Sequence, residues 1–290
     1  MGGTIGAGAN FKRFAMIIKS SEQINNIERG LLLVIKIGGN VIDDEKSLRS
    51  FLREFSSIKG EKILVHGGGK IATTIGDKLN IQSKYIDGRR ITDDETIDLV
   101  TMVYGGLVNK KIVATLQSLQ CNAIGLSGAD ANVLPAKKRP VKTIDYGWVG
   151  DVDAAEINTS AWQLFIDNNL VPVVASLTHD KEGHILNTNA DTMAAVLSIA
   201  LSEFYKVKLI YCFEKNGVLT NVDNETTIIT ELDVQTYNEL KEDKKLFAGI
   251  LPKIDNAFDA VNNGVYKVVI GNSYQLLQLV KGESGTKIIS

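Results

Sequence analysis

Apolar runs alternate with segments of helical spacing along the chain from Leu31 onward. Each run consists mainly of Val, Ile and Leu, which is typical of strands buried on both faces of a parallel sheet. Between them, the spacing of apolar residues predicts helices at 45–58, 70–79 and 192–203. The strand-like runs are LLLVIKI (31–37), EKILVH (61–66), CNAIGL (121–126), LVPVVASL (170–177) and VKLIYCF (207–213). This alternation predicts an α/β fold, a three-layer αβα sandwich around a mainly parallel central sheet.

Short motifs predict where several elements begin. Thr92-Asp93-Asp94-Glu95 matches a capping box, and the helical spacing of the apolar residues behind it predicts a long helix. Asn189 is suited to cap the helix that follows it, and Pro252 suits the first turn of another. The polar, turn-rich segments 128–150 and 221–232 predict hairpins.

Composition excludes several classes of protein. Of the 290 residues 44% are hydrophobic, enough for a full core, and 32 Lys and Arg against 34 Asp and Glu leave a net charge of −2. This charge provides no long-range attraction for nucleic acid or an anionic membrane, so neither is expected as a partner. No run of about 18 apolar residues follows residue 30, so no membrane span is expected.

Cysteine usage and the N-terminus indicate a cytoplasmic protein. Cys121 and Cys212 both lie in apolar, strand-like runs, which favours two reduced core thiols over a disulfide or a metal pair. The apolar stretch near the N-terminus is too short for a secretory signal, and Gly6 stands where a myristoylation motif needs Ser or Thr. We expect residues 1–30 to be an extension.

Two glycine-rich turns are the first candidates for chemistry, because ligands of open α/β sheets bind beyond the carboxyl ends of the strands. Lys36-Ile37-Gly38-Gly39-Asn40 ends the first predicted strand. His66-Gly67-Gly68-Gly69-Lys70 ends the second and leads into a helix, whose N-terminus favours anions. Adjacent glycines let backbone N–H groups approach an anion, with a lysine in reach. Two such turns imply two anionic ligands, or two ends of one reaction.

Polar residues elsewhere add to these turns. Alternation places Asn187 and Asn189 on one side of an extended segment, where two amides could hold one polar ligand, although capping of the helix before Asp191 is the simpler interpretation. Lys253 and the arginines of a predicted hairpin at 85–92 would, taken singly, be solvated surface charges. Their occurrence with two glycine turns in one α/β chain favours a site in which an arginine holds a carboxylate.

Together these motifs resemble the amino acid kinase family, in particular its branch that acts on N-acylated glutamate. The likeness is carried, in the family's order, by LVIKIGGN (33–40), LVHGGGK (64–70), DGRRITD (87–93), LNTNAD (186–191), GVL (217–219) and AGILPK (248–253). It implies transfer of the terminal phosphoryl group of ATP, with Mg²⁺, to the side-chain carboxylate of N-acetyl-L-glutamate or N-succinyl-L-glutamate in arginine biosynthesis. A carboxylate is a nucleophile at neutral pH, so no catalytic base or protein metal ligand is expected.

The resemblance also implies a role for each matching residue. Lys36 and Lys253 match two lysines that stabilise the transferring phosphoryl group, and Asp191 matches the carboxylate that holds them. The residues implied to contact the nucleotide are Gly38, Gly39, Glu214, Gly217 and Leu219. Those implied to contact the acylglutamate are Gly68, Gly69, Asn187, Asn189 and Arg90, the last on the α-carboxylate.

The same resemblance implies how the chain is organised. An extension (1–30) precedes a lobe for acylglutamate binding and dimerisation (31–190) and a lobe for ATP binding (191–290), with no Pro/Gly/Ser-rich linker between the lobes. Arginine-inhibited relatives use an N-terminal helix to join dimers into a hexamer. Glycines weaken a helix before Asn10, and the tail LVKGESGTKII is similar to that of insensitive relatives, so we expect a homodimer.

Some positions depart from the family pattern. The nucleotide turn contains Glu214 and Lys215 where relatives commonly have an Asp-containing turn, and Ala129 stands where many have lysine. A succinyl group would need an additional cation in the pocket, for which Lys70 and Arg89 are candidates.

Two other functions fit parts of the sequence. Gly67-x-Gly69-x-x-Ala72 followed by Asp87 matches a dinucleotide-binding fingerprint, which would indicate an NAD-dependent oxidoreductase. That function leaves Lys36 and Lys253 without a role. A non-catalytic ligand sensor on the same fold is the other alternative, and it would bind ligands without phosphoryl transfer.

Overall fold

A computed structural model describes residues 30–86, 88–243, 245–246 and 249–289 of the chain. Contacts divide the chain into two units, Met1–Gly30 and Leu31–Ser290, and the description below concerns the second. The predicted extension, with its helix-weakening glycines, lies outside the described residues. Leu31–Ser290 forms one compact unit, and the division of roles near residue 190 stays a prediction.

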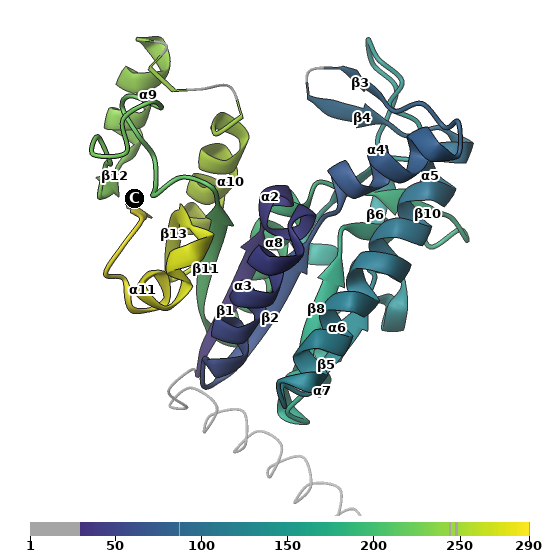
Figure 1. The fold of residues 1–290 in the computed structure, drawn as a ribbon, viewed down its shortest axis with the longest axis horizontal. Helices are drawn as coiled ribbons and strands as arrows, with labels where there is room; N and C mark the ends of the chain where they lie inside the picture. The colour runs from purple at the N-terminus through teal and green to yellow at the C-terminus, as the bar shows by residue number, and fades with distance from the viewer. Residues whose placement is uncertain (1–29, 87, 244, 247–248, 290) are drawn as a thin grey trace, which may run out of the picture. The chain divides into compact units, whose positions relative to one another are not determined.

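Eight strands of the described chain form one sheet, and all neighbouring pairs are parallel except β13 with β14 (Figure 1). The five strand-like runs of the sequence all contribute to it. In sheet order the strands are β12 (Glu231–Leu232), β14 (Thr286–Ile288), β13 (Lys267–Asn272), β11 (Lys206–Phe213), β1 (Leu31–Ile37), β2 (Glu61–His66), β8 (Val171–Ala175) and β5 (Ala123–Leu126). The predicted mainly parallel sheet is therefore confirmed.

Helices cover both faces of this sheet, which confirms the three-layer sandwich. Alternate residues of β1 belong to two different cores, Leu32 and Val34 to one and Leu33 and Ile35 to the other, because successive side chains of a strand point to opposite faces. The helices of the first core are α7 (Thr159–Asp167), α8 (Ala190–Leu201), α9 (Val234–Glu242) and α10 (Leu251–Asn262). Those of the second include α2 (Gly39–Asp43), α3 (Glu45–Ser57), α4 (Gly69–Lys78) and α11 (Leu276–Lys281).

A long helix crosses the second face in three continuous parts: α5 (Asp94–Val100), the π-helix η2 (Thr101–Val108) and α6 (Asn109–Ser118). The predicted capping box is off by one residue, because Asp93 and not Thr92 accepts the hydrogen bond from Thr96 N, at 3.0 Å. Thr92 instead forms a buried β-bridge with Gly147. No sequence pattern predicted the π-helix.

This helix, Asp94–Ser118, is long and apolar enough to cross a membrane by length and composition, although no membrane span was expected from the sequence. Its residues Leu99, Ile112 and Leu116 are fully buried in the core beneath it. It is therefore a core helix of this fold.

Local predictions elsewhere had mixed outcomes. Asn189 caps α8 and Pro252 lies in the first turn of α10, as predicted. The segment 128–150 leads into an antiparallel pair, β6 (Ala136–Lys138) with β7 (Gly150–Val152). An antiparallel bridge between Leu219 and Ile228 closes a short hairpin that begins before the predicted range 221–232, and Asn side chains form tight turns within it. The arginine hairpin is confirmed as β3 (Lys84–Ile86) with β4 (Arg89–Ile91), and a further pair joins β9 (Leu177–His179) to β10 (Ile185–Asn187).

Both cysteines are free and buried, as predicted. Cys212 lies within β11, but Cys121 precedes β5 and is not part of a strand.

Candidate functional site

A carboxylate between two lysines is the centre of the candidate site. Lys36 Nζ lies 2.7 Å from Asp191 Oδ1, and Lys253 Nζ lies 2.5 Å from Asp191 Oδ2. The three residues come from β1, the first turn of α8 and the first turn of α10. The sequence predicted this grouping by resemblance, and the structure brings all three together. Lys253 is therefore an ion-pair partner rather than a solvated surface charge.

Burial and charge together determine the protonation of this cluster. Burial alone would raise the pKa of Asp191, but the ammonium groups of Lys36 and Lys253 outweigh it and lower that pKa to about 2. Burial lowers the pKa of Lys36, and the charge of Asp191 opposes this effect. Asp191 is therefore ionised at neutral pH and holds both ammonium groups in one small region.

Neighbouring groups fix Asp191 itself. Asn189 Oδ1 accepts hydrogen bonds from Asp191 N at 2.9 Å and Thr192 N at 3.0 Å, so the cap begins α8 at the required residue. The buried hydroxyl of Tyr211, on the strand next to Lys36, donates to the Asp191 carbonyl oxygen at 2.9 Å. Sequence reasoning missed Tyr211, whose apolar strand gave no signal of a polar contact.

The first glycine turn follows Lys36 directly. Gly38 N donates to the Cys212 carbonyl oxygen of β11 at 3.0 Å, and a β-carbon on Gly38 would lie 3.3 Å from the same oxygen. The backbone of this turn therefore lies against the end of β11 more closely than most side chains would allow. Gly39 begins the short helix α2.

The second glycine turn lies at the end of β2, next to the first because β1 and β2 are parallel neighbours. A side-chain contact joins the two turns, since Lys70 Nζ donates to Asn40 Oδ1 at 2.7 Å. A β-carbon on Gly68 would lie only 2.8 Å from the Tyr104 ring, so the turn packs directly on the π-helix. Tyr104 is a second residue that sequence reasoning did not connect with the site.

Arg90 links the hairpin to the second turn. Its Nη2 donates to the Gly69 carbonyl oxygen at 2.9 Å and to Thr73 Oγ1 at 3.0 Å, and its Nη1 donates to Ser83 Oγ. Arg90 is buried, with 7% of its surface exposed, whereas Arg89 is exposed. Arg90 also forms a side-chain hydrogen bond with Tyr104, so most of its five N–H donors are used within the protein.

The two asparagines have local partners. Asn187 Nδ2 donates to Thr92 Oγ1 at 3.0 Å, which connects β10 to the segment that leads into α5. Asn189 uses its side-chain oxygen as the α8 cap. The simpler interpretation of Asn189 as a cap is therefore confirmed, and ligand contacts of either amide stay a prediction.

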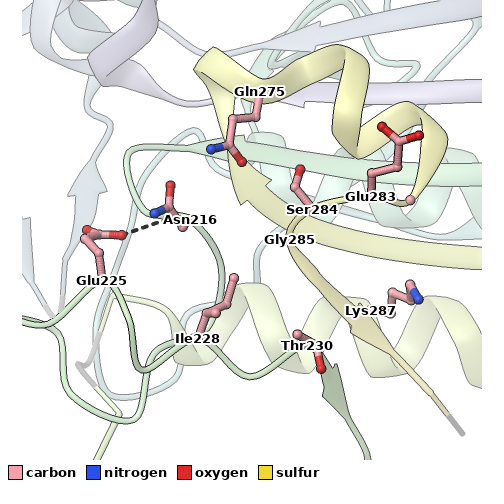
Figure 2. Close-up of a pocket in the computed structure, with 10 residues that line it drawn as sticks. Asn216, Glu225, Ile228, Thr230, Gln275, Glu283, Ser284, Gly285 and Lys287 are labelled. Atoms are coloured by element: carbon pink, nitrogen blue, oxygen red, sulfur yellow. Dashed lines mark hydrogen bonds between the residues drawn. The ribbon is translucent and has the colours of Figure 1, made fainter.

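The predicted nucleotide segment 214–219 follows β11. Gly217 lies so close to β14 that a β-carbon would come within 2.6 Å of Thr286 Oγ1, and Val218 N donates to the same oxygen at 2.8 Å. A hollow of about 380 Å³ lies beside this loop, and Asn216 and Glu225 are among the residues that line it (Figure 2). None of the residues around this hollow belongs to the Lys36–Asp191–Lys253 cluster.

We expect Asp191→Asn to lower the free energy of unfolding by about 3–5 kcal/mol at pH 7, since two buried ammonium groups lose their counter-charge. The Asp191 pKa is 3.8 in the unfolded reference and about 2 in the fold, so its contribution is present above 3.8 and declines as the pH falls toward 2. Urea unfolding of wild type and variant between pH 7 and pH 3 measures this convergence. Asp77→Asn, at an exposed position of α4, is the control, and a difference independent of pH would contradict the ion-pair account.

Comparisons with known proteins agree with this geometry. The model of the amino acid kinase family matches residues 32–272. The acetylglutamate kinase of Cytophaga hutchinsonii is 49% identical over 262 residues, covering 89% of this chain and 98% of the relative. That of Bacteroides thetaiotaomicron is 48% identical over 260 residues, covering 90% and 99%.

A solved structure shares the fold along its whole length. The crystal structure of smu.665 from Streptococcus mutans UA159 superposes with a TM-score of 0.73 at 29% identity, covering 89% of this chain and 98% of that one. The match of sequence family, full-length relatives and fold argues against the dinucleotide-binding alternative, whose Asp87 lies outside the described residues. This chain belongs to the amino acid kinase family.

Proposed function

We propose that this protein transfers the terminal phosphoryl group of ATP to the side-chain carboxylate of N-acetyl-L-glutamate, a step of arginine biosynthesis. The buried cluster of Lys36, Asp191 and Lys253 is the observation that carries the proposal. Relatives named acetylglutamate kinase match nearly their full length at 46–49% identity, which supports this acceptor.

The reaction needs alignment and positive charge rather than a proton-transfer group. A carboxylate oxygen of the acceptor attacks the γ-phosphorus, a P–O bond forms, and the bond between that phosphorus and the β,γ-bridging oxygen breaks to release ADP. Charge increases on the transferring and leaving oxygens. Lys36 and Lys253 would stabilise it, while Asp191 holds the lysines and does not contact the substrate.

The two glycine turns would hold the two reactants at adjacent strand ends. The N–H group of Gly39 would contact the phosphates of ATP, and Gly38, whose own N–H donates to the Cys212 carbonyl oxygen, would let the phosphates approach the backbone of the turn. Segment 214–219, with Glu214, Gly217 and Leu219, would contact the nucleotide. N–H groups of Gly68 and Gly69 would contact the acceptor carboxylate. This arrangement is supported by the parallel neighbours β1 and β2 and by the Lys70–Asn40 contact between the turns.

Mg²⁺ would enter as the ATP complex. Both oxygens of Asp191 face lysine ammonium groups, so the carboxylate of this cluster is not available as a metal ligand. Mg²⁺ commonly retains waters and binds phosphate oxygens, a mode that fits such a site. Bound there, the ion would neutralise charge on the phosphates.

The remaining contacts would select the acceptor. The guanidinium of Arg90 would bind the α-carboxylate, and the side chains of Asn187 and Asn189 would bind the other polar groups of the acylated amino acid. Lys70, the candidate for a succinyl carboxylate, is 70% exposed in its side chain and already contacts Asn40 and Asp43, and Arg89 is exposed. Neither Lys70 nor Arg89 is held toward a pocket, which favours the acetyl over the succinyl group as the acyl group of the acceptor.

We further propose that the enzyme works in the cytoplasm, where its two buried thiols remain reduced. Residues 31–190 would form the lobe that binds the acylglutamate, and residues 191–290 the lobe that binds ATP. A homodimer is supported by apolar residues on the outer side of the long helix, Met102 at 56% and Leu107 at 38% exposure.

Purified enzyme should form ADP from ATP and Mg²⁺ with N-acetyl-L-glutamate, more slowly with N-succinyl-L-glutamate, and not with L-glutamate. Lys36→Ala should lower kcat by about 10²–10³, in line with loss of one group that stabilises transition-state charge. The exposed Lys46→Ala on α3 is the matched control and should leave the rate unchanged. Ligand binding without turnover would indicate a non-catalytic ligand sensor instead, and bound NAD(H) would support an NAD-dependent oxidoreductase.

Arg90→Lys should raise the KM for N-acetyl-L-glutamate about tenfold to a hundredfold, the equivalent of one hydrogen bond to a charged group, with the KM for ATP unchanged. Steady-state kinetics with each substrate varied in turn measure this split. The exposed neighbour Arg89→Lys should affect neither constant. An equal rise in both constants for Arg90→Lys would place the arginine outside the acceptor site.

Sedimentation velocity should show a dimer at micromolar concentration, and Met102→Glu should convert it to a monomer by placing a charge in an apolar interface. Leu164→Glu, at a 61% exposed apolar position of α7 in the opposite helix layer, is the control and should leave the dimer intact. A wild-type monomer, or a Met102→Glu dimer, would refute this interface.

A further inference from the structure

A buried histidine and asparagine lie directly beneath the second glycine turn and have no role in the mechanism above. His66, the last residue of β2, is fully buried, and Asn109, the first residue of α6, is 1% exposed. Asn109 Nδ2 lies 3.0 Å from His66 Nε2 and 2.9 Å from the Val173 carbonyl oxygen. His66 Nδ1 lies 2.8 Å from the Gly67 carbonyl oxygen.

These contacts fix which nitrogen of His66 carries the proton. The group that faces the Val173 carbonyl must be the amide NH₂ of Asn109, because an oxygen there would face another acceptor. The same NH₂ donates to His66 Nε2, which is therefore unprotonated. His66 Nδ1–H then donates to the Gly67 carbonyl oxygen. Burial lowers the pKa of His66 to about 4, so the ring stays neutral at physiological pH.

The orientation of Asn109 that donates to His66 leaves its own side-chain oxygen without a hydrogen bond. Asn109 Oδ1 is buried and has no hydrogen-bond partner among the described residues, a defect that ordinarily destabilises a protein. Gly125 of β5 leaves space for it, since a β-carbon there would come within 2.0 Å of Asn109 Oδ1. A leucine at position 109 would have no unsatisfied oxygen, but it has no donor, and a serine there could donate only one hydrogen bond. Only an amide NH₂ donates to both His66 Nε2 and the Val173 carbonyl oxygen.

The π-helix brings the supporting residues under the turn. Asn109 N donates to the Tyr104 carbonyl oxygen, five residues back, which is the hydrogen-bond pattern of a π-helix. This pattern stacks residues five apart, so Tyr104 packs on Gly68 while Asn109 reaches His66. An ordinary α-helix would turn these two side chains well apart.

The hydrogen bond from His66 controls the direction of one N–H group. The carbonyl of Gly67 and the N–H of Gly68 belong to one planar trans peptide unit and point in opposite directions. A ring that holds the carbonyl on the buried side therefore directs the Gly68 N–H to the other side. The next peptide is held similarly, because the Gly68 carbonyl accepts from Ala72 N at 2.9 Å and thereby directs the Gly69 N–H.

We propose that His66 and Asn109 are positioning residues for phosphoryl transfer, which hold the Gly67–Gly68 peptide so that the Gly68 N–H points at the carboxylate being phosphorylated. The inference rests on the proposed function, in which Gly68 contacts the acceptor. Neither side chain touches substrate. The requirement is a neutral His66 with its proton on Nδ1, and Asn109 selects that tautomer.

Kinetics of three variants test the proposal. His66→Leu removes the donor to Gly67, so kcat with N-acetyl-L-glutamate should fall about tenfold or more, while the KM for ATP stays within twofold. His66→Asn can place its amide near the position of Nδ1 and should restore most of kcat. Asn109→Leu leaves Nδ1 free to lose its proton to Nε2, so it should lower kcat without removing any group from the turn.

Controls separate positioning from loss of stability. Ile112→Val, fully buried one turn further along α6, should destabilise the protein slightly and leave kcat unchanged. Failure of wild type to form ADP would refute the proposed function, whereas an active wild type whose His66→Leu variant keeps kcat within twofold would refute only this inference.

A measurement on wild type keeps the proposal testable if the variants do not fold. The chain has three histidines, His66, His179 and His184, so ring ¹⁵N signals can be assigned with a His179→Gln, His184→Gln double variant. We expect one ring that stays neutral from pH 8 to pH 5.5 with its proton on Nδ1. A proton on Nε2 of His66, or titration of this ring near its ordinary pKa, would overturn the proposal.

Discussion

The ion pairs of Asp191 are the constraint on which the rest of the site depends. Two ammonium groups can be buried side by side only if an anion compensates their repulsion, and here one carboxylate contacts both. The three groups together carry one net positive charge. That remaining charge is available to the oxygens of a transferring phosphoryl group, so the interaction that permits burial also leaves the site cationic. It requires the starts of α8 and α10 to meet the end of β1.

The parallel sheet meets that requirement and adds the glycine turns. β1 and β2 end at the same edge, so the backbone that follows Lys36 and the backbone that follows His66 lie next to each other. Each turn is held by contacts that a side chain would obstruct, Gly38 against Cys212 and Gly68 against Tyr104. Packing therefore sets the position of both turns. In the second turn, hydrogen bonds to the Gly67 and Gly68 carbonyls also set the direction of the N–H groups that follow them.

Features encoded in local sequence were predictable, and those that depend on distant contacts were not. The buried strands, the glycine turns and the Asn189 cap follow from short patterns, and Lys36, Asp191 and Lys253 were grouped by resemblance to a family. The cap of the long helix was misplaced by one residue because Thr92 pairs with Gly147, far along the chain. The π-helix and the contacts of Tyr211 and Asn109 depend on neighbours from other elements, so the spacing of apolar residues along the chain does not predict them.

Two buried polar clusters lie at the strand ends, His66 with Asn109 and Lys36 with Asp191 and Lys253. In both, the residues that would give the most stable core differ from those that hold the site in its geometry. An apolar pair would be more stable than His66 with Asn109, whose Oδ1 has no partner among the described residues. Hydrophobic residues would likewise avoid the desolvation of Lys36 and Asp191. In both places the polar groups hold the backbone or side chain that would face the reactants in the proposed function. The direction they give to an N–H or an ammonium group is the simplest physical reason for their presence.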